Sequence, residues 1–126
     1  MGGRILVVED NRKNRKLMVD VLKHYGFEVM EAEDGAQGIE TAKQHMPDLI
    51  FMDLQMPGIN GVEAIRAIKA APETRHIKII AVTAFAMRGD KEKILEDGAD
   101  GYISKPIDTR RLPEIAKKNM PGGTEL

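Results

Sequence analysis

The sequence predicts an α/β domain built on a parallel sheet. Short apolar segments rich in β-branched residues alternate with longer stretches that have the helical period of hydrophobic residues. Three of the apolar segments are almost continuous (ILVV, LIFM and IIAV), which is typical of strands covered by helices on both faces. A length of 126 residues corresponds to one domain. Such an alternation implies right-handed crossovers, with binding sites beyond the carboxyl ends of the strands.

Five segments are predicted to form strands, in the order strand, helix, strand along the chain. The three continuous apolar runs belong to the first, third and fourth strands, so these strands are predicted to be central in the sheet. The predicted strands are 4–8, 27–32, 49–52, 77–82 and 101–103.

The first helical segment follows the first strand and has its larger apolar residues on one face. Gly26 follows the pattern directly and is suited to the left-handed conformation that ends many helices. The residues of the predicted face are Leu17, Met18, Val21, Leu22 and Tyr25.

The second and third helices carry start signals. Asp34 is followed three residues later by Gln37, and Asn60 is followed three residues later by Glu63. This is the spacing of an N-cap residue and its reciprocal partner, so helices are predicted to begin there.

The last two helices are less regular in sequence. The fourth, around 90–96, is rich in charge and has Ile94 and Leu95 as its main apolar residues. Asp108 is a potential cap for the fifth helix, but Pro113 would then fall inside the helix and collide with a preceding carbonyl. The regular part is therefore predicted to start at Pro113.

Composition excludes several classes of function. Nineteen Lys and Arg residues against 20 Asp and Glu give a net charge of -1, so no overall field attracts nucleic acid or an anionic membrane. The absence of cysteine excludes disulfides, thiolate nucleophiles, iron–sulfur clusters and cysteine zinc sites, and the three histidines are too scattered for a metal site. No stretch approaches the roughly 20 apolar residues of a membrane span. We expect a cytoplasmic protein.

Polar residues cluster at the ends of the predicted strands. Glu9 and Asp10 follow the first strand, Asp53 the third, Thr83 the fourth and Lys105 the fifth. Any one acid there is most simply a turn residue, but parallel strands bring all five to one edge of the sheet. Three carboxylates and one ammonium leave a formal charge of -2, which favours a bound Mg²⁺ ion. Asp53, on a central strand, is then a candidate nucleophile toward phosphorus.

Four segments in order resemble the response-regulator receiver domain: 5–11 (ILVVEDN), 47–61, 82–86 (VTAFA) and 102–106 (YISKP). The resemblance covers essentially the whole chain. It implies a flavodoxin-like (βα)5 three-layer sandwich whose five-stranded parallel sheet has the order 2-1-3-4-5.

Within that family, segments 84–90 (AFAMRGD) and 103–107 (ISKPI) are most similar to single-domain regulators of the DivK type and to the receivers of hybrid histidine kinases. We expect residues 1–119 to form the receiver domain and 120–126 a flexible tail.

The resemblance assigns the phosphoryl site residue by residue. Asp53 corresponds to the phosphorylated aspartate, and Asp10, Asp53 and the backbone carbonyl of Gln55 to the ligands of Mg²⁺, with Mn²⁺ as an alternative ion. Glu9 corresponds to the outer acid that acts on the metal through water. Many members have Asp-Asp where this chain has Glu-Asp, so the role of Glu9 is less firmly assigned than that of Asp10.

The resemblance also assigns the residues that respond to phosphorylation. Thr83 corresponds to the switch hydroxyl and Lys105 to the lysine that pairs with the phosphoryl group. Pro106 corresponds to a proline that family members hold in a cis peptide bond with Lys105, whereas the residues alone favour trans. Tyr102 corresponds to an aromatic side chain that moves between exposed and inward positions, although an edge-strand Tyr is by itself most simply a packing residue.

The function expected from these residues is a phosphorylation-controlled switch in two-component signal transduction. It takes a phosphoryl group from a histidine kinase or histidine phosphotransfer protein, with at most self-phosphorylation from small donors and self-dephosphorylation as catalysis. Output is expected through a protein partner at the fourth helix, fifth strand and fifth helix, without an output domain of its own. We expect no nucleic acid or membrane partner, and a monomer or weak dimer.

Three alternatives remain open at this stage. The first is that the chain is a receiver domain excised from a hybrid histidine kinase or a larger regulator. The second is a small flavin-binding electron carrier, which the acidic, glycine-free segment 9–13 after the first strand disfavours. The third is a phosphatase with an aspartyl nucleophile, but Gln55 stands where haloacid-dehalogenase-type enzymes have a second Asp.

Overall fold

The computed structural model describes residues 3–56, 58, 60–84 and 88–120. Strands and helices alternate as predicted, and each strand boundary lies within one residue of its expected position. The elements are β1 (Arg4–Val8), α1 (Arg12–His24), β2 (Glu28–Ala32), α2 (Gly35–His45), β3 (Leu49–Asp53), α3 (Gly61–Ala70), β4 (Lys78–Thr83), α4 (Arg88–Glu96), β5 (Gly101–Ser104) and α5 (Leu112–Lys118). Of the expected flexible tail, 120–126, residues 121–126 lie outside the described residues, and Met120 packs against the hydrophobic core beneath α1 and α5.

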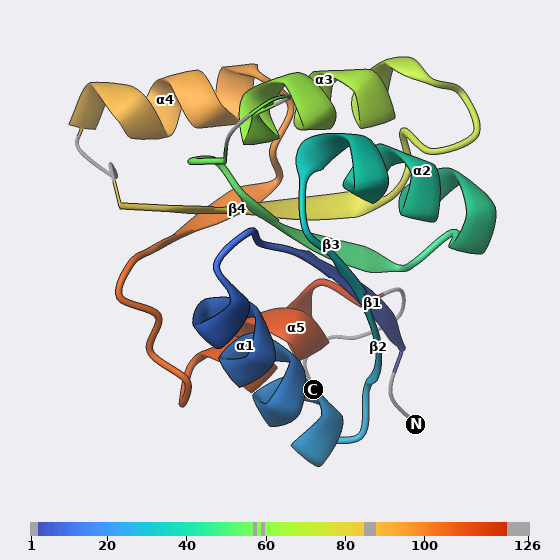
Figure 1. Ribbon diagram of the computed structural model, residues 1–126. Coiled ribbons are helices and arrows are strands. Elements are labelled where there is room, and N and C mark those ends of the chain that lie inside the picture. Colours follow the sequence, from blue (N-terminus) through green and yellow to red (C-terminus); the bar gives the residue numbers. More distant parts are fainter. Residues whose placement is uncertain (1–2, 57, 59, 85–87, 121–126) are drawn as a thin grey trace.

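The five strands form one parallel sheet of order β2-β1-β3-β4-β5, which confirms the predicted fold class. Helices α2, α3 and α4 cover one face, and α1 and α5 cover the other (Figure 1). Each helix layer packs its own hydrophobic core against the sheet. Ala42, Ile65 and Ile68 belong to the core beneath α2, α3 and α4, and Leu22 and Leu112 belong to the core beneath α1 and α5. The molecule is therefore a three-layer sandwich.

The predicted central strands are central. All five residues of β3 are buried, and four of the five in β1 are buried, whereas β2 and β5 at the sheet edges are largely intermediate or exposed. Helices on both faces remove both sets of side chains from water, so a continuous apolar run marks these positions.

The predicted apolar face of α1 is only partly correct. Met18 and Leu22 are buried as expected, but Leu17 is 45% exposed and Tyr25 is 52% exposed, while Val19 is buried. The helix is rotated so that Met18, Val19 and Leu22 meet the sheet and α5. Leu17 and Tyr25 lie on the flank of that stripe, where the hydrophobic pattern alone does not separate buried from exposed positions.

The helix caps agree with the start and stop signals. Asn60 and Glu63 form a reciprocal capping box at the start of α3. The Asp34 side chain accepts a hydrogen bond from Gln37 N, but Gln37 Oε1 accepts from Glu33 N and not from Asp34 N as predicted. Gly26, after the C-cap of α1, has φ 93°, in the left-handed region that glycine adopts without strain.

Two expectations about the last helices are wrong in detail. Ile94 of α4 is buried, but Leu95 is 46% exposed because successive residues of a helix point about 100° apart and α4 contacts the domain on one side only. Helix α5 begins at Leu112, one residue before the predicted start, so Pro113 occupies its second position. Proline is tolerated there because the N–H groups of the first turn have no helical partner.

Candidate functional site

The sheet brings the predicted site residues to one rim. Asp53 is the last residue of β3 and pairs in register with Val82, one residue before Thr83 ends β4. Glu9 directly follows β1, and Lys105 directly follows β5. Glu9, Asp53 and Thr83 are each only 1% exposed. These side chains are buried because parallel strands end at one edge, where the loops close over them.

Lys105 connects the end of β5 to the acids. Its Nζ donates a hydrogen bond to Asp53 Oδ1 at 3.0 Å and lies 3.7 Å from Glu9 Oε1. Its backbone N donates to the Thr83 carbonyl at 2.8 Å, and the peptide bond to Pro106 is cis. The ammonium thus lies beside both buried carboxylates.

The acidic cluster fits a divalent cation. Glu9, Asp10 and Asp53 each offer a carboxylate oxygen, and these oxygens lie within 4.8 Å of one another. Glu9 Oε1 and Asp53 Oδ2 are buried without a hydrogen-bond partner, although buried polar atoms are normally satisfied. Three carboxylates beside the single ammonium of Lys105 favour a hard cation that accepts few protein oxygens and keeps water ligands, as Mg²⁺ does.

Burial changes the acidity of Glu9. The pKa of Glu9 is raised from 4.5 to about 7, chiefly because burial removes its carboxylate from water and also because the neighbouring Asp53 carboxylate favours a shared proton. The Asn11 backbone N–H, which donates to Glu9 Oε2 at 3.1 Å, and the Lys105 ammonium act in the opposite direction. Glu9 therefore gains or loses its proton near neutral pH.

The Gln55 side chain has a role that the sequence interpretation missed. Its backbone N donates to Asp53 Oδ1 at 3.1 Å. Its Nε2 donates to Thr83 Oγ1 at 2.8 Å, and its Oε1 accepts a hydrogen bond from the Ala84 backbone N at 3.1 Å. The sequence interpretation assigned the Gln55 carbonyl to the metal and noted the Gln55 side chain only in place of a second Asp, so it did not predict these hydrogen bonds to Thr83 and Ala84.

The loop after Asp53 requires a glycine at the start of α3. A Cβ at position 61 would collide with the carbonyl oxygen of Asp53 and lie 2.7 Å from Leu54 Cα. Asn60 caps the helix immediately before this close approach. Gly61 thereby lets α3 pack directly against the chain segment that carries the candidate nucleophile.

Tyr102 lies on the edge strand β5, close to the site. It is half-buried and packs against the core beneath α4, and Lys91 Nζ lies 5.3 Å from its ring centroid. Its register partner on β4 is Ala81, two residues before Thr83. The motif at 84–90 is described only in part, because 85–87 lie outside the described residues.

Comparison with known proteins gives a consistent result. Residues 5–117 match the family model described as the response regulator receiver domain. The chain is 44% identical over 116 residues to the polar-differentiation response regulator DivK of Brucella anthropi, covering 92% of this chain and 94% of DivK, and equally similar to DivK of Brucella ovis.

Solved structures show the same fold. The receiver domain of sensor histidine kinase PA1611 from Pseudomonas aeruginosa, described with a magnesium ion in its active site cleft, has a TM-score of 0.86 and 35% identity over 94% of this chain and 98% of that one. Vibrio cholerae CheY4 has a TM-score of 0.89 at 24% identity, covers 95% of this chain and 100% of its own, and supports the fold alone. Among the described residues, no helix has the length and apolar character needed to span a membrane.

Proposed function

Since this chain belongs to the response regulator receiver domain family of two-component signalling, we propose that Asp53 is the residue that accepts the phosphoryl group. Members of this family are signalling switches rather than ordinary enzymes. The observation that carries the proposal is the position of Asp53. It is buried at the end of a central strand, within 3.0 Å of Lys105 Nζ and among carboxylates that fit a cation. The family assignment leaves the flavin-carrier hypothesis without support.

Asp53 is suited to nucleophilic attack because its surroundings hold its carboxylate in one orientation. Lys105 Nζ and Gln55 N both donate to Oδ1, which fixes the plane of the carboxylate. One carboxylate oxygen attacks phosphorus as the bond from phosphorus to the donor's imidazole nitrogen breaks, and the released imidazole takes a proton. The Lys105 ammonium stabilises the negative charge on the transferred oxygens.

Mg²⁺ would be held by Asp10, Asp53 and the backbone carbonyl of Gln55, with Glu9 acting through water. The ion, when bound, neutralises negative charge on the phosphoryl oxygens and orients them. Glu9 Oε1 and Asp53 Oδ2, both buried and without a hydrogen-bond partner, support this assignment. Mn²⁺ satisfies the same oxygen donors.

A labelling experiment tests the assignment. The protein is incubated with Mg²⁺ and a small phosphodonor, and the modified residue is located by mass spectrometry. We expect one phosphoryl group on Asp53, with no labelling of Asp53→Asn and weakened Mg²⁺ binding by Asp10→Asn. The control Asp20→Asn, an exposed α1 residue paired with Lys16, should be labelled as the wild type is. Full labelling of Asp53→Asn at the wild-type rate would refute the proposal.

Receiver domains receive phosphoryl groups from histidine kinases or phosphotransfer proteins, and we propose that this chain signals onward through the α4–β5–α5 face. Thr83 ends the strand beside β5, and Tyr102 lies on β5 itself. A cavity of about 320 Å³ on this face is lined in part by Tyr102, Pro106 and Ile115. Rearrangement of Thr83 and Tyr102 would change the shape of that surface and bias two pre-existing arrangements.

Calorimetric binding of a kinase or adaptor candidate, with and without beryllofluoride, tests this output route. Tighter binding with beryllofluoride, reduced by Thr83→Ala and by Tyr102→Ala, is expected. The expected strength of coupling is about 1–3 kcal/mol, the usual range for allosteric proteins. Chemical-shift changes confined to the surface near α2 would contradict the route.

A further inference from the structure

We infer that the Gln55 side chain is a latch that holds the resting state of the switch, an inference that rests on the proposed function of Asp53. Its amide joins the β3–α3 connection to two groups at the end of β4 at once. Nε2 donates to Thr83 Oγ1 at 2.8 Å, and Oε1 accepts from Ala84 N at 3.1 Å. The primary amide supplies a donor and an acceptor side by side in one plane.

The latch acts on the residues that have to move. Thr83 is the proposed switch hydroxyl, and Ala84 is the first residue of the β4–α4 connection. If Thr83 turns its hydroxyl toward a phosphoryl group on Asp53, the bond from Gln55 Nε2 has to lengthen or break. If the connection moves with it, the bond from Ala84 N to Gln55 Oε1 has to break as well. The phosphorylated arrangement therefore forms only at the expense of both bonds.

The space next to the latch permits its release. A cavity of about 230 Å³ adjoins Gln55 and Thr83 and is bordered by Leu54, Val62 and Ile94. A released Gln55 side chain can enter this cavity and form new hydrogen bonds to water at its open side, so the amide is not left buried and unpaired. The opening of the latch is thus sterically accessible.

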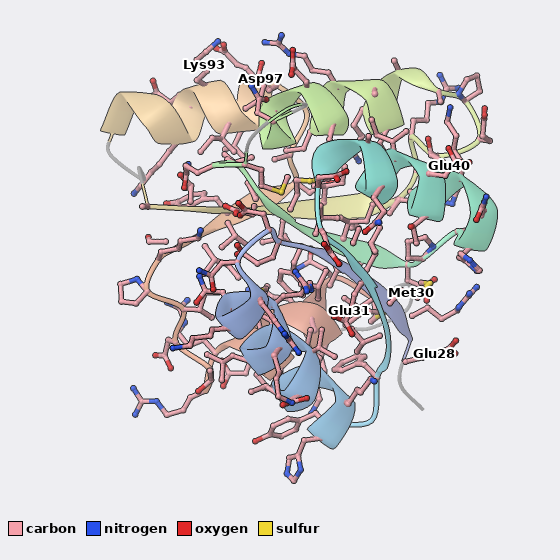
Figure 2. The ribbon with its side chains drawn as sticks, viewed as in Figure 1. Glu28, Met30, Glu31, Glu40, Lys93 and Asp97 are labelled. Atoms are coloured by element: carbon pink, nitrogen blue, oxygen red, sulfur yellow. The ribbon has the colours of Figure 1, made fainter. Side chains whose placement is uncertain are left out.

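The far end of α4 is held by other contacts. Arg66 of α3 forms an ion pair with Asp97, whose side chain is 8% exposed, and Lys69 of α3 pairs with Asp100 at 3.0 Å. Figure 2 shows Lys93 and Asp97 at the end of α4 that lies next to α3. These ion pairs hold the chain just after the carboxyl end of α4, whereas the latch acts on Ala84, which lies before α4 in the sequence and directly after β4.

Beryllofluoride titration with saturating Mg²⁺, followed by NMR, tests the latch. Gln55→Met keeps the length of the side chain and removes both hydrogen bonds. We expect it to bind beryllofluoride about tenfold more tightly than the wild type, because the bonds that oppose the change are already absent, and tenfold corresponds to about 1.4 kcal/mol. Without beryllofluoride, the Ala84 amide resonance of Gln55→Met should lie closer to its bound position. Gln44→Met, on the exposed side of α2, is the matched control and should behave as wild type.

A second measurement needs no substitution. In the wild type, the side-chain NH₂ resonances of Gln55 should shift on beryllofluoride binding, as its bond to Thr83 breaks. If the wild type binds beryllofluoride but these resonances do not move, or if Gln55→Met binds no more tightly, the latch is wrong and the proposed function stands. If the wild type shows no Mg²⁺-dependent binding of beryllofluoride, the proposed function fails and the latch fails with it.

Discussion

Replacement of Glu9 by Gln should remove the loss of stability that the buried carboxylate causes as the pH rises. The pKa of Glu9 is raised from 4.5 to about 7, first by burial and then by the hydrogen bond with Asp53, so the folded protein retains a proton at pH values where the unfolded chain has lost it. A group that binds its proton more tightly when folded lowers stability as pH rises, beginning near 4.5 and levelling off above 7. Gln, an uncharged isostere, lacks this effect.

The magnitude follows from that pKa rise. A rise of about 2.5 pKa units, at about 1.4 kcal/mol per unit, corresponds to about 3 kcal/mol in full. Most of this loss of stability, roughly 2–3 kcal/mol, should occur between about pH 5 and pH 8. The free energy of unfolding of Glu9→Gln minus that of the wild type should therefore increase by this amount across the range.

Urea unfolding at several pH values, with a metal chelator present, measures this difference directly. The control Glu73→Gln alters an exposed carboxyl and should give a difference that does not change with pH. Saturating Mg²⁺ should reduce the gap at pH 8, because the cation balances the ionised Glu9 carboxylate. Parallel stability curves for Glu9→Gln and wild type from pH 5 to pH 8 would show that burial does not perturb Glu9, and the reasoning would be refuted.

Three further substitutions test how the structure positions the site. Gly61→Ala places a Cβ against the Asp53 carbonyl and should lower both the unfolding temperature and Mg²⁺ affinity; unchanged values in both would contradict this close approach. Thr74→Val removes the buried hydrogen bond from Thr74 Oγ1 to Ile68 O at 2.7 Å and should cost about 1–3 kcal/mol in urea unfolding, without altering beryllofluoride binding. Asn60→Ala removes the α3 cap and should cost about 1 kcal/mol by the same assay, whereas Asn60→Asp should retain most of the stability.

Local pattern was sufficient to predict the strands and most helix boundaries. Continuous apolar runs identified β1, β3 and β4 because both faces of a central strand lie under helices. The polar residues after those strands were predicted to meet because parallel strands share one carboxyl edge, and Glu9, Asp10 and Asp53 lie together there. The strand order itself came from a family resemblance, since alternation alone does not specify which strands are neighbours.

The tertiary structure decided the features that depend on contacts between distant segments. Packing against the sheet and α5 selected Val19 rather than Leu17 as a buried residue of α1, although both fit an apolar stripe. The hydrogen bond between Gln55 and Thr83 joins residues 28 positions apart. A sequence pattern records the period of one element, whereas the rotation of a helix and the partner of a side chain depend on which surfaces the fold brings together. For that reason the sequence predicts which residues line the site, and the structure shows how Gln55 links them.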